Sequence, residues 1–585
     1  MEYQLITPHI PLNAEVSAVE RVLSNRGIPL HDIKHYLNTT DEDILSPGLI
    51  MNMEAGVKML ISHIAKNSKV LVQVDSDCDG YTSAAALINY LNCLFPSFAQ
   101  NNIIYRIHKG KEHGLIPDVI PTDVSLVIAP DSSSNDYEQH AKLKERGVDV
   151  LVIDHHEADM ISTDACIINN QLCDYPTKSL SGVGMVYKFC QYIDELLNVD
   201  YAENFVDLAA LGMIADMMDL RDCETKHIIS LGLANVRNPF FRAMVEKQAF
   251  SLKGELTPMG VAFYISPYVN ATIRMGTHEE KITLFESMLD FRGYERITST
   301  KRGARGELEM RIEQAVRNCS NIKNRQTRAR DAALETIEKI IKEKNLLDNK
   351  ILIIKLNQTM AVEKTLTGLI ANQLMAKYQR PVLILNQVVS DDGVISWEGS
   401  GRGYDKSKFD NLREFLKESE LVMYAEGHAN ALGVGITDLE FQAFVNYQNH
   451  ALAEFDFTPC YKVDFIFNAN NFSSKDILDI ASLKPLWGQN IDECKIALED
   501  VKVSKNNITL MGLEKGKPTL RITLPNKTSL IKFKSSQEEY DRLTASECVT
   551  INVVGTCEAN YFGGTVLPQI LVEDYEITNE VSWYF

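Results

Sequence analysis

Residues 70–83 read VLVQVDSDCDGYTS. The first five form a short, apolar and β-branched run that is typical of a buried strand, and carboxylates at alternate positions follow it directly. Acidic side chains this close together repel one another, and each raises the pKa of the next unless protons or a divalent ion intervene. This pattern favours a metal site at the end of a strand. The alternative is an acidic turn that caps the apolar helix starting near Ser83.

The composition is that of a folded protein with sizeable cores. Hydrophobic residues make up 45% and charged residues 24% of the 585 positions, which is ordinary for a soluble globular chain of about three or four domains. The net charge of -20 argues against indiscriminate binding of nucleic acids, although a local basic groove can still bind phosphates. Eleven cysteines without a CxxC pair favour reduced thiols and argue against a zinc ribbon. The sequence shows neither a signal peptide nor eighteen consecutive apolar residues, so we expect a soluble, cytoplasmic protein without a membrane segment.

The order of strand, turn and helix repeats twice further along the chain. Residues 124–128 form a second apolar run that leads into Pro130-Asp131, and residues 148–153 form a third that leads into Asp154-His155-His156. Near-continuous apolar strands separated by helical segments predict a parallel sheet covered on both faces, and hence the α/β class. In such sheets the ligand lies beyond the carboxyl ends of the strands.

We therefore expect the acidic and histidine side chains to converge at one edge of this sheet. Asp216 joins them at the end of a mostly apolar helix, residues 208–216, where an unpaired acid would be costly. Carboxylates with one or two imidazoles suit manganese or magnesium better than a thiolate-preferring ion. Two such ions can activate water and stabilise both oxygens of a phosphoryl transfer. We favour a two-metal centre over a set of unrelated strand-end caps.

Four motifs resemble those of a known family: VDSDCDG at 74–80, APDSS at 129–133, VIDHH at 152–156 and LGMIAD at 211–216. They look like the four motifs of the DHH phosphoesterase superfamily, and their order and spacing are similar to those of the RecJ single-stranded-DNA exonucleases. NRGI at 25–28 also resembles the N-terminal segment of that family. The resemblance implies manganese as the usual metal and the following metal ligands: Asp75, Asp77, Asp79, Asp131, Asp154, His155 and Asp216. It also places His156 beside the scissile phosphate, makes Asp131 and His155 its catalytic companions, and puts Asp131 at the position that bridges the ions.

Two further segments supply candidate phosphate contacts. Residues 105–115 resemble a segment where the family has an arginine and Gly-Tyr-Gly, but this chain has Glu-His-Gly with Lys109 and Lys111 instead. These lysines are candidates for phosphate binding, and a solvated basic turn is the alternative. Residues 266–276 resemble the family's P-x-x-N-A-x-x-R-M-G segment, which makes Arg274 a candidate phosphate clamp and an interdomain salt bridge its alternative.

The second half of the chain resembles the domain that accompanies the catalytic domain in RecJ, known as DHHA1. GSGRG at 399–403 and EGHANALG at 426–433 look like its two glycine-rich motifs, which implies these substrate contacts: Ser400, Arg402, Gly427 and His428. Glycines let backbone N–H groups approach a phosphate, while the side chains supply further donors. Glu426 replaces a glycine and Gly403 replaces a serine of the family pattern, so the details of phosphate contact differ.

We expect an α/β protein of two lobes with mainly parallel sheets, joined by a long helix and followed by a small β-barrel of the OB type. The predicted boundaries are 1–69 for a helical lead-in, 70–295 for the DHH domain, 296–346 for the connecting helix or helices, 347–454 for DHHA1 and 455–585 for the barrel. The connecting segment carries nine Lys or Arg against three Glu within residues 301–330, so it lines a nucleic-acid channel or is simply a solvated helix. In the barrel, Tyr561, Phe562, Lys532 and Lys534 are candidates for holding a single strand, with Phe533 in the core.

The resemblance implies a metal-dependent exonuclease that degrades single-stranded DNA from 5′ to 3′ with two divalent ions, Mn²⁺ by preference or Mg²⁺. Such an enzyme would act in DNA repair, recombination or replication, with single-strand-binding or helicase proteins as partners. One alternative is a DHH phosphodiesterase for short oligonucleotides or cyclic dinucleotides. Another, of a different class, is a non-catalytic replication scaffold built on the same domains.

Overall fold

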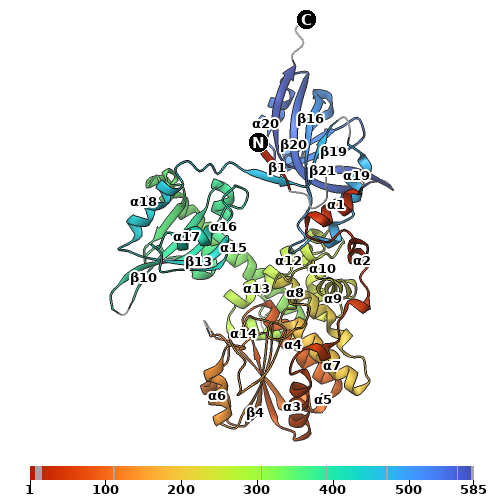
Figure 1. The fold of residues 1–585 in the computed structure, drawn as a ribbon, viewed down its shortest axis with the longest axis vertical. Helices are drawn as coiled ribbons and strands as arrows, with labels where there is room; N and C mark the ends of the chain where they lie inside the picture. Colours follow the sequence, from red (N-terminus) through yellow and green to blue (C-terminus); the bar gives the residue numbers. More distant parts are fainter. Residues whose placement is uncertain are drawn as a thin grey trace. The chain divides into compact units, whose positions relative to one another are not determined.

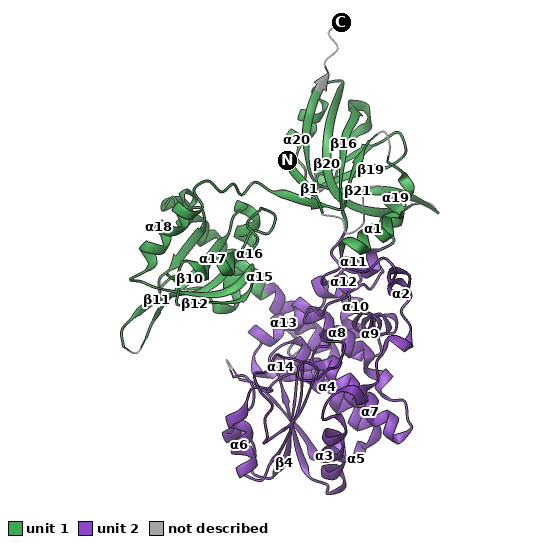
Figure 2. Ribbon diagram, viewed as in Figure 1, with its two compact units in different colours: residues 1–25, 325–482, 494–585 green, residues 26–324, 483–493 purple. Residues whose placement is uncertain are grey.

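A computed structural model describes residues 1–6, 16–109, 112–304, 306–390, 392–469, 472–562 and 564–581. The chain forms two compact units (Figure 2). Unit 1 contains residues 1–25, 325–482 and 494–585, and unit 2 contains residues 26–324 and 483–493. The two units are divided at other residues than the domain boundaries expected from the sequence. Those five domain boundaries stay predictions.

Unit 2 is built on a five-stranded sheet in the order β3-β2-β4-β5-β6. Its strands are β2 (Lys69–Val74), β3 (Ile103–Ile107), β4 (Val124–Pro130), β5 (Asp149–Asp154) and β6 (Cys166–Asn169). Every neighbouring pair is parallel, which confirms the predicted α/β class with a parallel sheet. Because β2 pairs with β3 on one side and β4 on the other, the strand order reverses there, and such a switch point is where α/β sheets bind ligands.

Helices cover both faces of this sheet. In Figure 1, α6 lies on one side of β4, and α3 and α7 lie on the other. The helices of unit 2 are α2 (Ile33–Leu37), α3 (Met53–Ala65), α4 (Cys78–Leu94), α5 (Pro96–Asn102), α6 (Tyr137–Glu145), α7 (Gly182–Leu197), α8 (Val206–Ala215), α9 (Cys223–Ala234), α10 (Pro239–Lys247), α11 (Ala249–Leu252), α12 (Pro258–Tyr264), α13 (Ser266–Met275) and α14 (His278–Ser287). A short ribbon of β7 (Arg296–Thr298) and β8 (Leu308–Met310) precedes α15 (Arg311–Glu343).

The long helix α15 begins in unit 2 and ends in unit 1, as the predicted connecting helix would. Several of its basic side chains form ion pairs with neighbouring acids. Arg317 pairs with Glu309, and Arg330 lies 2.6 Å from Asp331. Less of the predicted positive charge is therefore left for a nucleic-acid strand than the count of basic residues implies.

Unit 1 contains a second sheet, in the order β12-β13-β11-β10-β9. It consists of β9 (Leu352–Leu356), β10 (Val382–Val389), β11 (Ile395–Arg402), β12 (Tyr424–His428) and β13 (Ala431–Thr437), with helices α16 (Lys364–Tyr378), α17 (Leu412–Glu418) and α18 (Phe441–Ala451). Only β9 and β10 are parallel, and the other three pairs are antiparallel. The expectation of a mainly parallel second sheet is corrected here, because short hairpins join β10 to β11 and β12 to β13, whereas parallel strands need a crossover such as α16.

The C-terminal sheet has seven strands in the order β15-β16-β20-β21-β19-β18-β17. They are β15 (Phe465–Asn468), β16 (Lys495–Ser504), β17 (Ile508–Met511), β18 (Thr519–Thr523), β19 (Ser529–Phe533), β20 (Cys548–Phe562) and β21 (Thr565–Val581), with α19 (Ser474–Ala481) and α20 (Gln537–Thr544). No pairing between described residues joins the outer strands β15 and β17, so closure into an OB-type barrel stays a prediction.

Two details of this region differ from expectation. Phe533 ends β19 and is 58% exposed, so it does not belong to the core, and Lys532 pairs with Glu539 at 2.7 Å. The chain also begins with a strand, β1 (Glu2–Leu5), which pairs in parallel with β14 (Cys460–Val463). The helical lead-in therefore starts later than predicted, at α1 (Ala18–Asn25). No single helix in the described ranges is long and apolar enough to cross a membrane. One bent pair of helices, 41–49 and 53–65, meets that criterion only when the two are counted together.

A buried ion pair ties α7 to α9 inside unit 2. The Lys188 ammonium lies 2.8 Å from Glu224 Oε1, and both side chains are almost completely buried. Tyr175 donates a hydrogen bond of 2.9 Å to the same carboxylate, and the Leu45 carbonyl accepts one from Lys188. Each charge is thus fully partnered, which is the condition under which such a pair is tolerated in a core.

We expect Lys188→Met to lower the free energy of unfolding by about 3–5 kcal/mol, because Glu224 would then remain charged and buried without its cation. Urea unfolding followed by far-ultraviolet circular dichroism measures this change. Lys58→Met is the matched control, since Lys58 pairs at 2.6 Å with Glu54 on the exposed surface and its loss should leave the midpoint unchanged. Equal stability of the two variants would contradict this account.

Candidate metal centre

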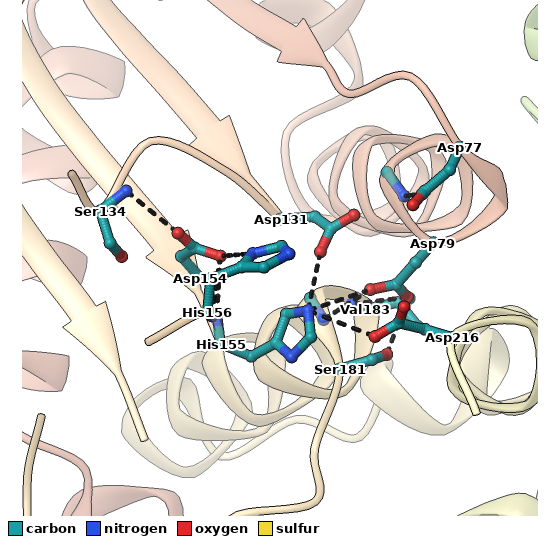
Figure 3. Close-up of polar contacts among 12 residues, drawn as sticks. Asp77, Asp79, Asp131, Ser134, Asp154, His155, His156, Ser181, Val183 and Asp216 are labelled. Atoms are coloured by element: carbon teal, nitrogen blue, oxygen red, sulfur yellow. Dashed lines mark hydrogen bonds and ion pairs between the residues drawn. The ribbon is translucent and has the colours of Figure 1, made fainter. Parts of the chain in front are cut away.

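Acidic side chains from several strand and helix ends meet at the carboxyl edge of the parallel sheet (Figure 3). Asp75 directly follows β2, and Asp77 caps α4 by accepting a hydrogen bond of 2.9 Å from the Gly80 N–H. Asp131 follows β4, and Asp216 follows α8. The structure therefore brings together residues that the sequence separates by 141 positions from Asp75 to Asp216.

His155 lies at the middle of this cluster. Its Nε2 atom is 3.3 Å from Asp131 Oδ1, 3.4 Å from Asp216 Oδ2 and 4.0 Å from Asp79 Oδ2. Burial lowers the pKa of His155, so the imidazole is neutral and can offer a lone pair. Three groups of ligand atoms at this site are close enough to share an ion: Asp79 with His155 and Asp216, Asp75 with Asp77 and Asp131, and Asp131 with Asp154, His155 and His156.

Asp131 has an oxygen that lacks a hydrogen-bond donor. No described group forms a hydrogen bond with Asp131 Oδ1, although the side chain is buried. Burial, followed by Asp79 and Asp77, raises the pKa of Asp131 well above its ordinary range and that of Asp216 to about 8. Burial and Asp77 raise the pKa of Asp75 to about 6. Divalent cations between these groups would supply the missing positive charge, so the donor set fits such ions.

The backbone around Asp131 is strained. Asp131 has φ 68° and Ser133 has φ 83°, a left-handed conformation that costs a non-glycine residue about 1–2 kcal/mol. The Asp131 N–H donates to the Ile153 carbonyl at 2.8 Å, which fixes this turn to the neighbouring strand. Strain of this kind persists where the surrounding structure holds it, and it gathers at functional sites.

The N-terminus of α7 holds Asp79. Ser181 Oγ donates at 2.7 Å, the Gly182 N–H at 2.6 Å and the Val183 N–H at 3.2 Å to this carboxylate. A side chain at Gly182 would collide with Asp131, and one at Gly212 would collide with Asp79. Sequence reasoning missed residues 181–183, although a serine directly before an apolar helix is a recognisable N-cap signal.

Asp154 and His156 form a second pair beside this cluster. Asp154 accepts hydrogen bonds from His156 Nδ1 at 2.8 Å, from the His155 N–H at 2.8 Å and from the Ser134 N–H at 3.0 Å. The bond that His156 donates to Asp154 outweighs burial and raises the pKa of His156 to about 9. Burial alone would raise the pKa of Asp154, but the bonds from His156 and Ser134 lower it to about 2. Asp154 thus orients His156, and it also lies with Asp131, His155 and His156 in a group of ligand atoms close enough to share an ion, so its role as a metal ligand stays a prediction.

Sequence reasoning also missed His108. This residue follows β3, is buried, and places Nε2 at 3.9 Å from Asp75 Oδ1. Burial and Arg106 lower its pKa to about 4. The predicted phosphate contacts near the site have different outcomes. Of the two lysines predicted near His108, Lys109 is exposed and Lys111 lies outside the described residues. Arg274 is exposed at the end of α13 and forms no ion pair among the described residues, so nothing in them supports the salt-bridge alternative.

Comparison with known proteins places this site in a family. The model of the DHH family, N-terminal domain, matches residues 69–213. A Bacillus subtilis protein of SPbeta prophage origin, YorK, whose name describes a single-strand DNA-specific exonuclease, is 37% identical over 582 residues that cover 99% of this chain and 98% of YorK. The chain belongs to the RecJ-like DHH family.

More distant RecJ proteins agree with this placement. The single-stranded-DNA-specific exonuclease RecJ of Bacillus subtilis is 24% identical over 96% of this chain and 68% of its own length. Among solved structures, RecJ of Thermus thermophilus in complex with Mn²⁺ has a TM-score of 0.68 at 17% identity and covers 99% of this chain and 80% of that one. At that identity the likeness shows a common fold.

The RecJ-like glycine motifs in unit 1 gather at the first turn of α16. Ser400 Oγ lies 2.8 Å from Thr367 Oγ1, and a side chain at Gly368 would collide with the Arg402 guanidinium. Arg402 and His428 both stand opposite Ala431 in the sheet. Gly427 has φ 120°, a conformation that only glycine adopts readily. Thr367 and Gly368 were not predicted, because their nearness to Ser400 arises only from the fold.

We expect Asp154→Asn to lower the pKa of His156 from about 9 toward its ordinary 6.5, because the carboxylate that stabilises the imidazolium is removed. Histidine-selective NMR titration of the metal-free chain measures this, and a pKa that stays near 9 would contradict the assignment.

The two pKa shifts also determine how the stability of the folded chain changes with pH. The contribution of His156 is complete below pH 6.5 and is lost as the pH rises through about 9, whereas that of Asp154 is present above pH 3.8 and is lost as the pH falls through about 2.

Proposed function

We propose that this RecJ-like chain is a divalent-metal-dependent exonuclease that hydrolyses single-stranded DNA from the 5′ end. The observation that carries the proposal is the spacing of Asp131, Asp216 and Asp79 around His155, with Asp131 Oδ1 left without a donor among described residues. The names of YorK and of the RecJ relatives, which describe single-strand DNA-specific exonucleases, support the substrate. The proposed setting is DNA repair, recombination or replication, with single-strand-binding or helicase proteins as partners.

Two divalent ions are the proposed cofactors, with Mn²⁺ preferred and Mg²⁺ as the alternative. RecJ of Thermus thermophilus is known in complex with each of these ions. Asp75, Asp77 and Asp131 would hold one ion, and Asp79, His155 and Asp216 the other. Asp131 is the residue proposed to serve both, since its Oδ1 lies 3.3 Å from His155 Nε2. When bound, such ions lower the pKa of water and neutralise charge on a phosphate under attack.

Side chains of the protein would bind and stabilise the phosphate beside these ions. His156 is cationic at neutral pH because Asp154 holds its proton at Nδ1, so it can stabilise negative charge on the scissile phosphate. It lines a cavity of about 600 Å³ together with Asp75, Asp131, His113 and Ser132, a volume suited to a small ligand such as a terminal nucleotide. Arg274 is the proposed additional phosphate contact.

Recognition of the 5′ end is proposed for unit 1. The side chains of Ser400 and Arg402 lie at the N-terminal turn of α16, where a helix dipole favours an anion. Burial lowers the pKa of Arg402, yet a guanidinium remains charged in proteins and can bind a terminal phosphate at two points. The C-terminal sheet is the proposed second contact for longer strands.

We expect Asp77→Ala, Asp131→Ala and Asp216→Ala each to retain less than about a tenth of the nuclease activity, since loss of an ion ligand costs several kcal/mol of transition-state stabilisation. Circular dichroism should show a folded chain. Asp123→Ala is the control, because Asp123 forms only an exposed pair with Lys69. Activity above a tenth in all three variants would overturn the two-metal centre.

We expect a 5′-labelled single strand to release labelled mononucleotide at the earliest times, a 3′-labelled strand to shorten progressively, and blunt duplex to resist. Gel analysis of the three substrates with Mn²⁺ measures this. Early release of the 3′ label, or equal cleavage of duplex, would overturn the proposed polarity and strand preference. Cleavage confined to dinucleotides would favour a short-oligonucleotide phosphodiesterase, and binding without cleavage would favour a scaffold.

A further inference from the structure

A second group of metal-ligand side chains lies in unit 2, outside the carboxylate cluster. It consists of His35 on α2, Asp43 at the end of the 3₁₀ turn Asp41–Asp43, and Cys223 at the start of α9. A nitrogen of His35, a carboxylate oxygen of Asp43 and the sulfur of Cys223 all lie within 4.8 Å of one another. Asp43 and Cys223 are 180 positions apart in the chain, so only the fold brings the three ligand types together.

His35 and Asp43 already form a close pair. His35 Nε2 lies 2.6 Å from Asp43 Oδ1, the carboxylate is almost buried and the imidazole is 57% exposed. The other oxygen, Asp43 Oδ2, accepts a hydrogen bond of 2.7 Å from the Thr40 N–H. The carboxylate is therefore fixed with one oxygen toward His35, and the exposed imidazole gives an ion access from solvent.

Cys223 is a half-buried free thiol beside this pair, and no described group forms a hydrogen bond with its sulfur. Burial, followed by Asp43 and Asp222, raises the pKa of the thiol, and Lys226 opposes them. The Lys226 ammonium is engaged elsewhere, because it donates to the Tyr36 carbonyl at 2.6 Å. A bound cation would supply the positive charge that a thiolate needs here.

Contacts on both sides of Asp43 hold this part of the chain against α9, which lies beside α2 in Figure 1. His227 Nε2 lies 3.0 Å from Asp41 Oδ1, and the Leu45 N–H donates to Glu224 Oε1 at 3.1 Å. One contact precedes Asp43 in the chain and the other follows it. The carboxylate therefore keeps its place beside α9 without an ion, and the site is preorganised.

The donor set decides which class of ion fits. Thiolate and imidazole suit zinc, whereas Mn²⁺ and Mg²⁺ prefer oxygen ligands. Zinc ligands lie about 2.0–2.3 Å from the ion, so atoms within 4.8 Å of one another can converge on one ion through small side-chain movements. We propose that His35, Asp43 and Cys223 form a second metal site, which binds Zn²⁺ and cross-links the segment around Asp43 to α9. The proposal goes beyond the function proposed above and does not depend on it.

The test uses Co²⁺, which enters zinc sites and absorbs light when a thiolate binds it. The full chain is freed of metal by a chelator and titrated with CoCl₂ in excess MgCl₂, which competes for the oxygen ligands of the carboxylate cluster. We expect thiolate-to-cobalt charge-transfer absorption that saturates at about one Co²⁺ per chain, and its loss on addition of ZnCl₂, because zinc binds such sites more tightly. Cys223→Ser should abolish the absorption. His35→Ala should weaken Co²⁺ binding by more than about tenfold, since loss of a ligand costs more than loss of a residue that supports one.

Cys93→Ser is the matched control, because Cys93 is an exposed free cysteine and its loss should leave the absorption unchanged. ZnCl₂ should also raise the thermal unfolding midpoint of the wild type and leave that of Cys223→Ser unchanged. Should Cys223→Ser fail to fold by circular dichroism, His35→Ala decides, since its side chain is exposed. No charge-transfer absorption in the wild type, its persistence in Cys223→Ser, or its loss in Cys93→Ser would overturn the proposal. Failure of the nuclease assays would leave this site standing, because carboxylates give no thiolate absorption.

Discussion

Repulsion between crowded carboxylates is the constraint on which the metal-centre edge of unit 2 depends. Asp79 and Asp131, which are buried, and Asp75, Asp77 and Asp216, which are half-buried, are brought together at a strand switch point, where removal from water and mutual repulsion make each charge expensive. The rest of the unit supplies hydrogen-bond donors and space for these carboxylates. The first turn of α7 donates to Asp79, and glycines at 182 and 212 give the carboxylates room. The chain does not supply enough positive charge to balance these carboxylates, and the lack is greatest at Asp131.

Two buried aspartates in this region show that hydrogen-bond donors decide whether the pKa of a buried carboxyl group rises or falls. Asp131 and Asp154 are both buried, yet the pKa of the first is raised well above its ordinary range and that of the second is lowered to about 2. Asp154 accepts hydrogen bonds from backbone and imidazole donors on both oxygens. Asp131 Oδ1 forms no hydrogen bond with a described group, although His155 Nε2 lies 3.3 Å away. Asp154 thus orients a histidine, whereas Asp131 keeps an oxygen without a hydrogen bond from a described group.

Much of this could be predicted from the sequence, because the relevant signals are local. The apolar runs before Asp75, Asp131 and Asp154 predicted parallel strands with acids at their ends, and the structure confirms the parallel sheet and gathers those acids. His108, Ser181 and Thr367 could not be found in this way, since each acquires its neighbours only through packing of distant segments. The mixed second sheet was also missed, because the apolar runs of its strands do not reveal their direction. Phe533 was placed in the core by alternation, which fails at the last residue of a strand.

The glycines that face the carboxylates make the site sensitive to changes that leave its charges intact. A methyl group added at Gly80, Gly182 or Gly212 would lie within 2.6 Å of Asp75, Asp131 or Asp79, closer than non-bonded atoms approach. Alanine at any of these positions would therefore displace a carboxylate although every acid and histidine stays in the sequence. The tolerance of the site to sequence change is set by residues without side chains as much as by the candidate ligands.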